Sequence, residues 1–192
     1  MDELEAMNML LRAIGSSPVN SLETPHPDAA NAKTTLNRIR KQAQKRGWWF
    51  NIDYNVKFTP DPSTGVVDIS PTMSKVVMVS PAHVVRGNKL YDNQNQTYKF
   101  TTPPVAIRVQ YVTQWEDMPQ SLQEYVAYVA AAHFVRDELE DSAKTASFRE
   151  EAGLAMMGVK KDDLEQGQYN VFNKNRVAHA LKGVRPYAVH NR

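Results

Sequence analysis

The sequence predicts an α+β fold: a helical bundle formed from both chain ends, an inserted small antiparallel β sandwich or barrel, and a C-terminal extended arm. Three observations predict it. Apolar residues recur at helical spacing before residue 51 and after residue 113. Between them, about six short strand-like segments alternate with proline-rich turns. The remainder is basic and lacks clean periodicity. We therefore expect a bundle domain (1–51 and 113–167), a β domain (52–112) and an arm (168–192).

Two helices are expected in the first part of the chain. Leu4 to Ile14 carries apolar residues at helical spacing, and Gly15 can end that helix. Asp28 is the expected N-cap of a longer second helix, which Gly47 ends. The apolar stripe of that helix consists of Ala29, Ala32, Leu36, Ile39 and Ala43. The aromatic run Trp48-Trp49-Phe50 then anchors the helix end in a core, with at least one tryptophan at a lobe or subunit boundary.

The central part of the chain changes to a period of two. Residues 52–58 alternate between apolar and polar side chains, as a half-buried strand does, and residues 105–112 form the clearest strand of the sequence. Shorter strands are expected at 66–69, 76–79 and 89–92, with one more between Tyr98 and Phe100. The connections are too short for crossover helices, so the strands should pair antiparallel.

Apolar residues recur at helical spacing again after residue 113. A third helix should begin near Met118-Pro119, since proline is tolerated in a first turn. Ser142 is the expected cap of a fourth helix, which Gly153 and Gly158 weaken and Gly167 ends. The apolar stripe of this fourth helix consists of Phe148, Ala152, Ala155, Met156 and Val159.

Composition narrows the class of protein. The chain has 192 residues, 42% hydrophobic and 23% charged, with a net charge of +2, as a globular protein of one or two lobes would. It has no cysteine, which excludes disulfides and thiolate metal sites and fits assembly in a reducing cytoplasm. The start lacks a basic secretory region, and the apolar run 125–135 is too short to span a bilayer. We therefore expect a soluble protein with no membrane partner.

Positive charge gathers in two segments that contain no acid. Residues 33–46 hold six basic side chains and residues 168–192 hold five. Within the first segment Arg38, Lys41 and Lys45 line one helix side. Such a side is usually a solvated surface; the alternative is a stripe that faces phosphates or a partner. No aromatic residues interleave with these charges, so any DNA contact would be electrostatic and non-specific.

The sequence contains no arrangement typical of catalysis. It has no phosphate-binding loop, dinucleotide fingerprint or metalloprotease motif, and its five histidines lack metal-ligand spacing. His133 and Asp137 could pair on one helix face, in a packing role. The carboxylate pairs 116–117 and 162–163 are adjacent in sequence, which does not place them across a cleft. We therefore predict no enzyme, no catalytic residue, no metal and no cofactor.

Several segments together carry a resemblance to a known family. The stretches LLRAIGSSPVNSLE, DAANAK, KRGWWFN, LYDNQNQTYKF and RVQYVTQWEDMPQSLQEYVAYVAAAHF resemble the tail tubular protein A family, the head-to-tail adaptors of short-tailed bacteriophages. The resemblance covers residues 4–136. It implies a virion protein of which about twelve copies form a ring with heterologous contacts below the portal. It also implies contact with a nozzle similar to tail tubular protein B, and a central channel through which DNA leaves.

These implications lead to predicted roles for individual residues. The basic arm should reach the portal or a neighbouring subunit through Tyr169, Phe172, Arg176, Leu181, Arg185 and Tyr187. Two turns should face the nozzle, one formed by Asp61, Pro62 and Ser63, the other by Gly87 and Asn88. Three side chains should face the channel, where transient and non-specific contact with genomic DNA would occur: Lys41, Lys45 and Arg46.

Two other classes of function stay open on the sequence alone. One is a cell-envelope polysaccharide or peptidoglycan hydrolase carried on the tail, which would need two carboxylates converging in a cleft. The other is a free, non-specific DNA-binding module, which salt-dependent DNA binding by the monomer would support.

Overall fold

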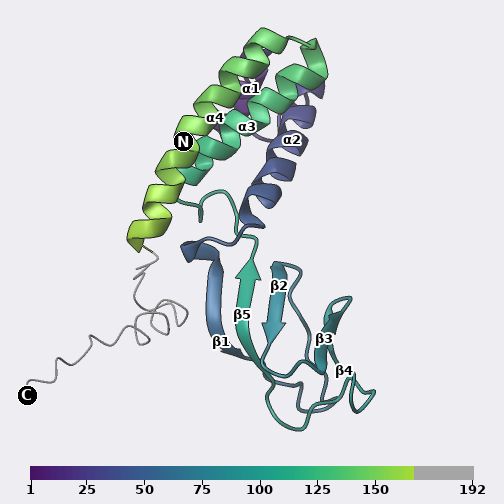
Figure 1. Ribbon diagram of the computed structural model, residues 1–192. Coiled ribbons are helices and arrows are strands. Elements are labelled where there is room, and N and C mark those ends of the chain that lie inside the picture. The colour runs from purple at the N-terminus through teal and green to yellow at the C-terminus, as the bar shows by residue number, and fades with distance from the viewer. Residues whose placement is uncertain (167–192) are drawn as a thin grey trace, which may run out of the picture.

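The computed structural model describes residues 1–166, and it confirms the α+β class. Helices and strands separate into two parts of an elongated molecule, joined where the chain crosses between them (Figure 1). The helical elements are α1 Glu3–Ala13, α2 Pro27–Gln44, the short 3₁₀ turn η1 Trp49–Asn51, α3 Gln120–Leu139 and α4 Ser142–Gln166. The strands are β1 Ile52–Lys57, β2 Met73–Met78, β3 His83–Arg86, β4 Lys89–Asp92 and β5 Val105–Tyr111.

One apolar cluster lies among the four helices. α3 runs through its centre and contacts each of α1, α2 and α4. The largest fully buried side chains of this cluster are Met7, Leu10, Leu11, Leu36, Trp48, Trp115, Leu122 and Phe134. Both helical stripes predicted for the N-terminal part supply side chains to this core. Helical spacing therefore identified the buried faces of α1 and α2 correctly.

Two predicted helix caps were wrong by one or two residues. α2 begins at Pro27 with His26 as its N-cap, so Asp28 lies in the first turn instead. Proline has the fixed backbone angle and missing N–H that suit a first helical position, which places the helix start earlier. At α4 the capping carboxylate belongs to Asp141, which accepts a hydrogen bond from the Lys144 amide at 2.9 Å. Ser142 is the first helical residue.

α4 is one unbroken helix of 25 residues despite its two glycines. Its predicted stripe faces α3: Ala152 and Val159 are buried, and Phe148 and Met156 pack against the helical core. Packing along α3 offsets the low helix propensity of glycine. The predicted stop at Gly167 lies outside the described residues.

The strands form two small antiparallel sheets. β5 is the central strand of the order β1-β5-β2, and β3 pairs with β4 through the turn that contains Gly87 and Asn88. A second apolar cluster joins the two sheets, with Phe58, Val67, Leu90 and Val109 among its buried members. The two sheets stay separate within the described chain and do not close into a barrel.

Two predicted strands were wrong, because each segment pairs at isolated residues only. Val66 pairs with Lys99, whereas Asp68, two residues later, pairs with Lys89. A segment that changes partner within two residues cannot form a continuous ladder, so residues 66–69 are not a strand. The segment around Tyr98 is limited in the same way to single bridges at Thr97 and Lys99.

Buried amides connect the two parts of the molecule. The Gln44 side chain, at the end of α2, is fully buried; its Nε2 donates to the Thr113 carbonyl at 3.1 Å and its Oε1 accepts from the Thr113 amide at 2.7 Å. The main-chain carbonyl of Gln44 accepts from Gln110 Nε2 at 2.7 Å and Asn51 Nδ2 at 3.2 Å. The Arg40 guanidinium also donates to the Thr113 carbonyl, at 2.6 Å. The chain passes from the helices to the strands after Gln44 and returns near Thr113, and these hydrogen bonds join the two passages.

None of the helices in residues 1–166 has the length and apolar content needed to cross a membrane.

Candidate functional site

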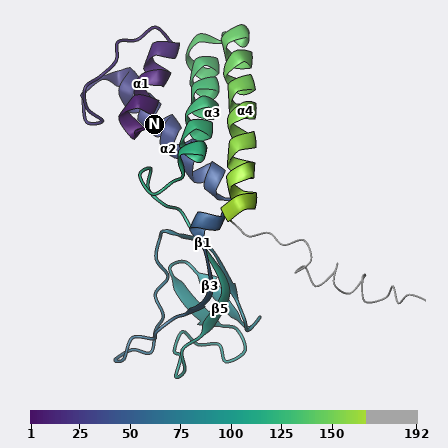
Figure 2. The same ribbon diagram turned by 90° about the vertical axis from the view of Figure 1, so that its left-hand side faces the viewer.

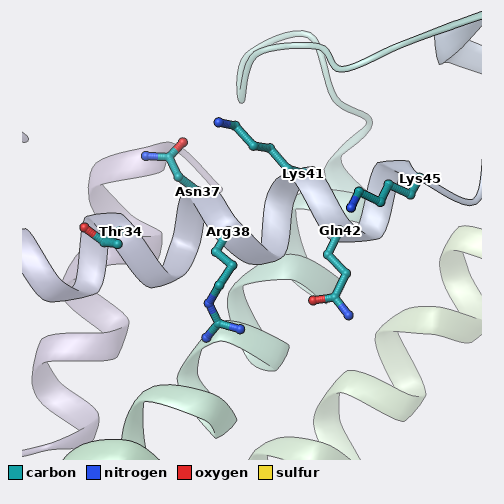
Figure 3. A pocket seen from close by; sticks show the side chains of 6 residues that line it. All are labelled: Thr34, Asn37, Arg38, Lys41, Gln42 and Lys45. Carbon is teal, nitrogen blue, oxygen red and sulfur yellow. The ribbon is translucent and has the colours of Figure 1, made fainter. Parts of the chain in front are cut away.

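The outer face of α2 carries a group of positive charges with no acid among them. Six polar side chains of this one helix line an open depression of about 930 Å³: Thr34, Asn37, Arg38, Lys41, Gln42 and Lys45. Figure 3 shows these side chains projecting from α2. Within residues 1–166, Arg38, Lys41 and Lys45 form no ion pair with a carboxylate. This face therefore presents positive charge to solvent.

The sequence explains why the charge gathers on this side of α2. The opposite side is buried through Ala32, Leu36 and Ile39, so the intervening positions point outward. The one acid in α2 is Asp28, in the first turn. The other basic residues of the predicted segment have different roles: Lys33 pairs with Glu23 at 2.6 Å, and Arg40 is buried. The exposed basic face therefore consists of Arg38, Lys41 and Lys45.

Arg46 lies apart from this face. Its guanidinium carbon is 4.8 Å from the centroid of the Trp48 ring, a cation–π arrangement. It lines a different depression, of about 310 Å³, together with residues of α3 and Met156. The structure therefore brings together two of the three side chains predicted to face a channel, Lys41 and Lys45, and separates the third.

The two turns predicted to face a nozzle lie at different ends of the β part. β1 begins next to η1 at the helical part and runs away from it (Figure 1), and the Asp61 turn follows its far end, where the Phe58 amide donates to the Pro104 carbonyl. Asn88 instead bonds to Ile69 and lines a depression with Met73, whose partner Tyr111 ends β5 beside the helices. The structure does not bring these turns together.

The Asp61 turn is held by its own carboxylate. Asp61 Oδ1 accepts from the Ser63 hydroxyl at 2.6 Å and amide at 2.9 Å, and from the Thr64 amide at 2.8 Å. These hydrogen bonds, that of the Ser63 hydroxyl foremost, lower the pKa of Asp61 to about 2. Gly65 follows with φ +73°, a left-handed conformation that favours glycine. The hydrogen bonds therefore hold this turn in one conformation, with a negatively charged Asp61 at neutral pH.

His133 and Asp137, which share a helix face, do not form an ion pair with each other. The sequence suggested that Asp137 pairs with His133, but Asp137 pairs with Arg136 instead, at 2.6 Å. Burial, followed by the nearby Arg136 and Arg38, lowers the pKa of His133. No group of three or more side chains in residues 1–166 is arranged to hold a metal ion.

Of the adjacent carboxylates noted in the sequence, at 116–117 and 162–163, Glu116 lies near Glu3. The pKa of Glu3 is raised by burial first, and Glu116 adds to this rise against the opposing effect of Arg40. Five of the surface depressions of residues 1–166 together have one carboxylate among their lining residues, Asp163. Asp163 Oδ1 accepts from the Trp49 main-chain amide at 3.3 Å, which connects the end of α4 to η1. Its observed contact is structural.

Sequence reasoning missed two features. The buried amides Gln44, Asn51 and Gln110 looked like surface residues, because amides are mostly exposed and the sequence does not show what they contact. The outer side of α4 exposes Leu154, Met157 and Leu164. A helix with apolar residues on two opposite faces was the signal that could have revealed this second surface. The predicted arm residues, from Tyr169 to Tyr187, lie outside the described part of the chain.

Comparison with known proteins supplies the context for these surfaces. The family model described as Tail tubular protein matches residues 4–180. The match extends past residue 136, where the recognisable segments of the sequence end. Tail tubular protein A of Klebsiella phage KP34 is 27% identical over 188 residues, which cover 96% of this chain and 98% of the relative.

Proposed function

The chain belongs to the tail tubular protein family, structural proteins of the bacteriophage virion tail, and on that premise we propose that it is a ring-forming connector between portal and tail nozzle. The observation that carries the proposal is the family match over residues 4–180, which includes both the helical and the β part. About twelve copies would form the ring through heterologous contacts, in which two different patches of each copy meet. The connector makes and breaks no covalent bond.

The basic face of α2 is the part of this connector that faces the DNA channel. Its support is the unpaired positive charge of Arg38, Lys41 and Lys45 on a helix with one acid. Repeated around a ring, this face would attract phosphates without reading sequence. Arg46 contributes to the channel only indirectly, since its guanidinium stacks on Trp48.

The remaining predicted surfaces have separate partners. The basic arm, residues 168–192, reaches the portal or a neighbouring subunit. The Asp61 turn faces the nozzle from the far end of the β part, which its self-contained hydrogen bonds support. Gly87 and Asn88 lie nearer the helices and would meet a different part of the nozzle or the adjacent subunit.

The two parts of the chain act as separate units. The bundle comprises residues 1–51 and 113–167, and the β unit comprises residues 52–112. The separate apolar clusters support this division. Assembly takes place in the host cytoplasm before the protein is incorporated into the tail, which a chain without cysteine tolerates.

Native mass spectrometry of the full-length protein mixed with the portal protein of the same phage tests the connector function. We expect a closed ring bound to the portal, with a mass that gives the copy number. A mixture in which the protein stays monomeric and unbound, or tails that carry no copy of it at the neck, would overturn the proposal. The free DNA-binding alternative predicts that the isolated monomer binds DNA as tightly as the ring does.

A further inference from the structure

α4 has an exposed apolar face that the other residues of 1–166 leave uncovered. Leu154, Met157 and Leu164 are 58%, 68% and 63% exposed. They lie at i, i+3 and i+10, within about 80° of one another around the helix. Buried Ala152 and Val159 lie on the opposite side, against α3. We call Leu154, Met157 and Leu164 the α4 outer stripe.

The position of α4 explains why this face is open. Figure 2 shows α4 at one side of the bundle, next to α3 and away from α1. Its helix contacts are with α3, and of its 25 residues only Thr145, Ala152 and Val159 are buried. Leu154 and Met157 are neighbours on this face, and Leu164 follows beyond Lys161, which pairs with Glu165 at 3.9 Å. Large apolar side chains that share one exposed helix face form a surface suited to a protein partner.

A second surface lies between α2 and α4. Both helices pack on α3. A depression of about 310 Å³ lies between α2, α3 and Met156 of α4, and a second of about 350 Å³ lies between α3 and α4; the two share Tyr125, Val129, His133 and Met156. We call this the α2–α4 groove. Its floor includes apolar Val129 and Met156 beside His133, and Gly153 on its α4 side leaves open space where a side chain would stand. The groove is therefore shaped to accept protruding apolar side chains.

The charges at the N-terminal end of the stripe are opposite in sign to those beside the groove. Glu150 and Glu151 precede Leu154 by one helical turn, are exposed, and have no ion-pair partner within residues 1–166. The groove is flanked by Arg46 on its α2 side and Arg149 on its α4 side, which likewise pair with no described carboxylate. Against a second copy, apolar side chains would meet the apolar part of the floor, and Glu150 and Glu151 would meet Arg149 and Arg46, the second of which also stacks on Trp48.

We propose that the α4 outer stripe of one copy packs into the α2–α4 groove of the next copy around the ring. This inference rests on the proposed connector function and adds the interface to it. A closed ring needs two different, mutually complementary patches on every copy, and the stripe and groove meet that requirement. The occupant of the groove is thus a second copy of this chain.

Charge insertion in the stripe tests the inference in the full-length protein. Leu154→Glu and Met157→Glu change exposed side chains, so both variants should keep the wild-type helical circular dichroism. Each should weaken self-association roughly 10- to 100-fold, because an unpaired charge would be buried at the contact. Leu139→Glu is the matched control, since Leu139 is an exposed leucine at the end of α3, outside both surfaces. It should assemble as wild type does.

Cysteine pairing gives a second, independent readout, because the natural chain has no cysteine. The double variant Met157→Cys/Gln42→Cys should form a disulfide-linked ladder of copies under mild oxidation, while the control pair Ile107→Cys/Gln42→Cys should not. Gln42 lines the groove, and Ile107 is an exposed apolar residue of β5.

The outcomes separate this inference from the connector function. Wild-type rings with full assembly of Met157→Glu would overturn the interface and leave the connector standing. A Met157→Glu variant that forms rings but fails to bind the portal or nozzle would assign the stripe to a different protein and also overturn the inference. Wild-type protein that forms no ring, alone or on the portal, would overturn both.

Discussion

The buried side chain of Gln44 provides the sharpest test of how the two parts of the molecule are joined. In the Gln44→Ala variant, the Thr113 carbonyl loses the Gln44 amide and the Thr113 N–H loses its acceptor at 2.7 Å. A buried main-chain group left without a partner costs about 1–3 kcal/mol. Arg40 still donates to the Thr113 carbonyl, so the cost at the carbonyl should lie at the low end of that range. The Thr113 N–H keeps no partner, so its cost should lie at the high end.

The sum for the two groups is about 3–4 kcal/mol of unfolding free energy, before the cavity left by the removed side chain is included. For a chain of this size that corresponds to a melting temperature lower by about 6–16 °C. Urea denaturation followed by tryptophan fluorescence measures the change. All three tryptophans (Trp48, Trp49 and Trp115) lie at the junction or in the helical core, so their emission reports on this region.

Two further variants isolate the cause. Gln44→Met keeps the length of the side chain without its hydrogen bonds, so the difference between Met and Ala at this position measures the cavity alone. Gln42→Ala, two residues earlier on the exposed side of α2, should stay within about 0.5 kcal/mol of wild type. If Gln44→Ala unfolds at the same urea concentration as Gln42→Ala, the amide network does not join the two parts of the molecule.

Three other predictions follow from described or predicted surfaces. Deletion of residues 168–192 should abolish docking to the portal while circular dichroism and the melting temperature stay near wild type; normal docking would exclude the arm. The double variant Lys41→Ala/Lys45→Ala should weaken DNA binding by the assembled ring. The slope of log K against log salt concentration should become shallower by up to about 0.9 for each lost phosphate contact. Lys99→Ala in the β part is the control and should change neither the affinity nor the slope. Burial lowers the pKa of His133 in the folded protein below its ordinary 6.5, so the folded state should lose stability as the pH falls through and below 6.5. The His133→Gln variant cannot take up this proton, so between pH 7.5 and 5.5 it should lose less unfolding free energy, measured by urea denaturation, than the wild type does. Equal losses would contradict this role of His133.

Periodicity in the sequence identified the helices and the two main strands because burial repeats with the geometry of each element. The apolar stripe of α2 is the clearest case, since Ala29, Ala32, Leu36 and Ile39 are all buried. Periodicity was least informative where one residue decides the outcome. The N-cap of α2 depended on Pro27, and the bridges of Val66 and Asp68 depended on partners more than 20 residues away.

The candidate surfaces divide in the same way. The basic face of α2 followed from helical spacing alone, because charges at i, i+3 and i+7 share a side of any helix. The separation of Arg46 from that face did not, since it depends on where the Trp48 ring lies. The α2–α4 groove depends on three helices that meet only in the folded chain, so no local pattern could have predicted it.

The hydrogen bonds between the helical part and the β part fix how the two are oriented. Each apolar cluster closes within its own part, so apolar burial stabilises the helical and β parts separately. Apolar contacts are non-directional and tolerate rotation, whereas hydrogen bonds weaken steeply with misalignment. The amides of Gln44, Asn51 and Gln110 bond across both chain crossings, so they fix the orientation of the β part as well as its attachment. A ring built from such subunits would hold its β units in one fixed direction, because a rotation would leave several buried polar groups without partners.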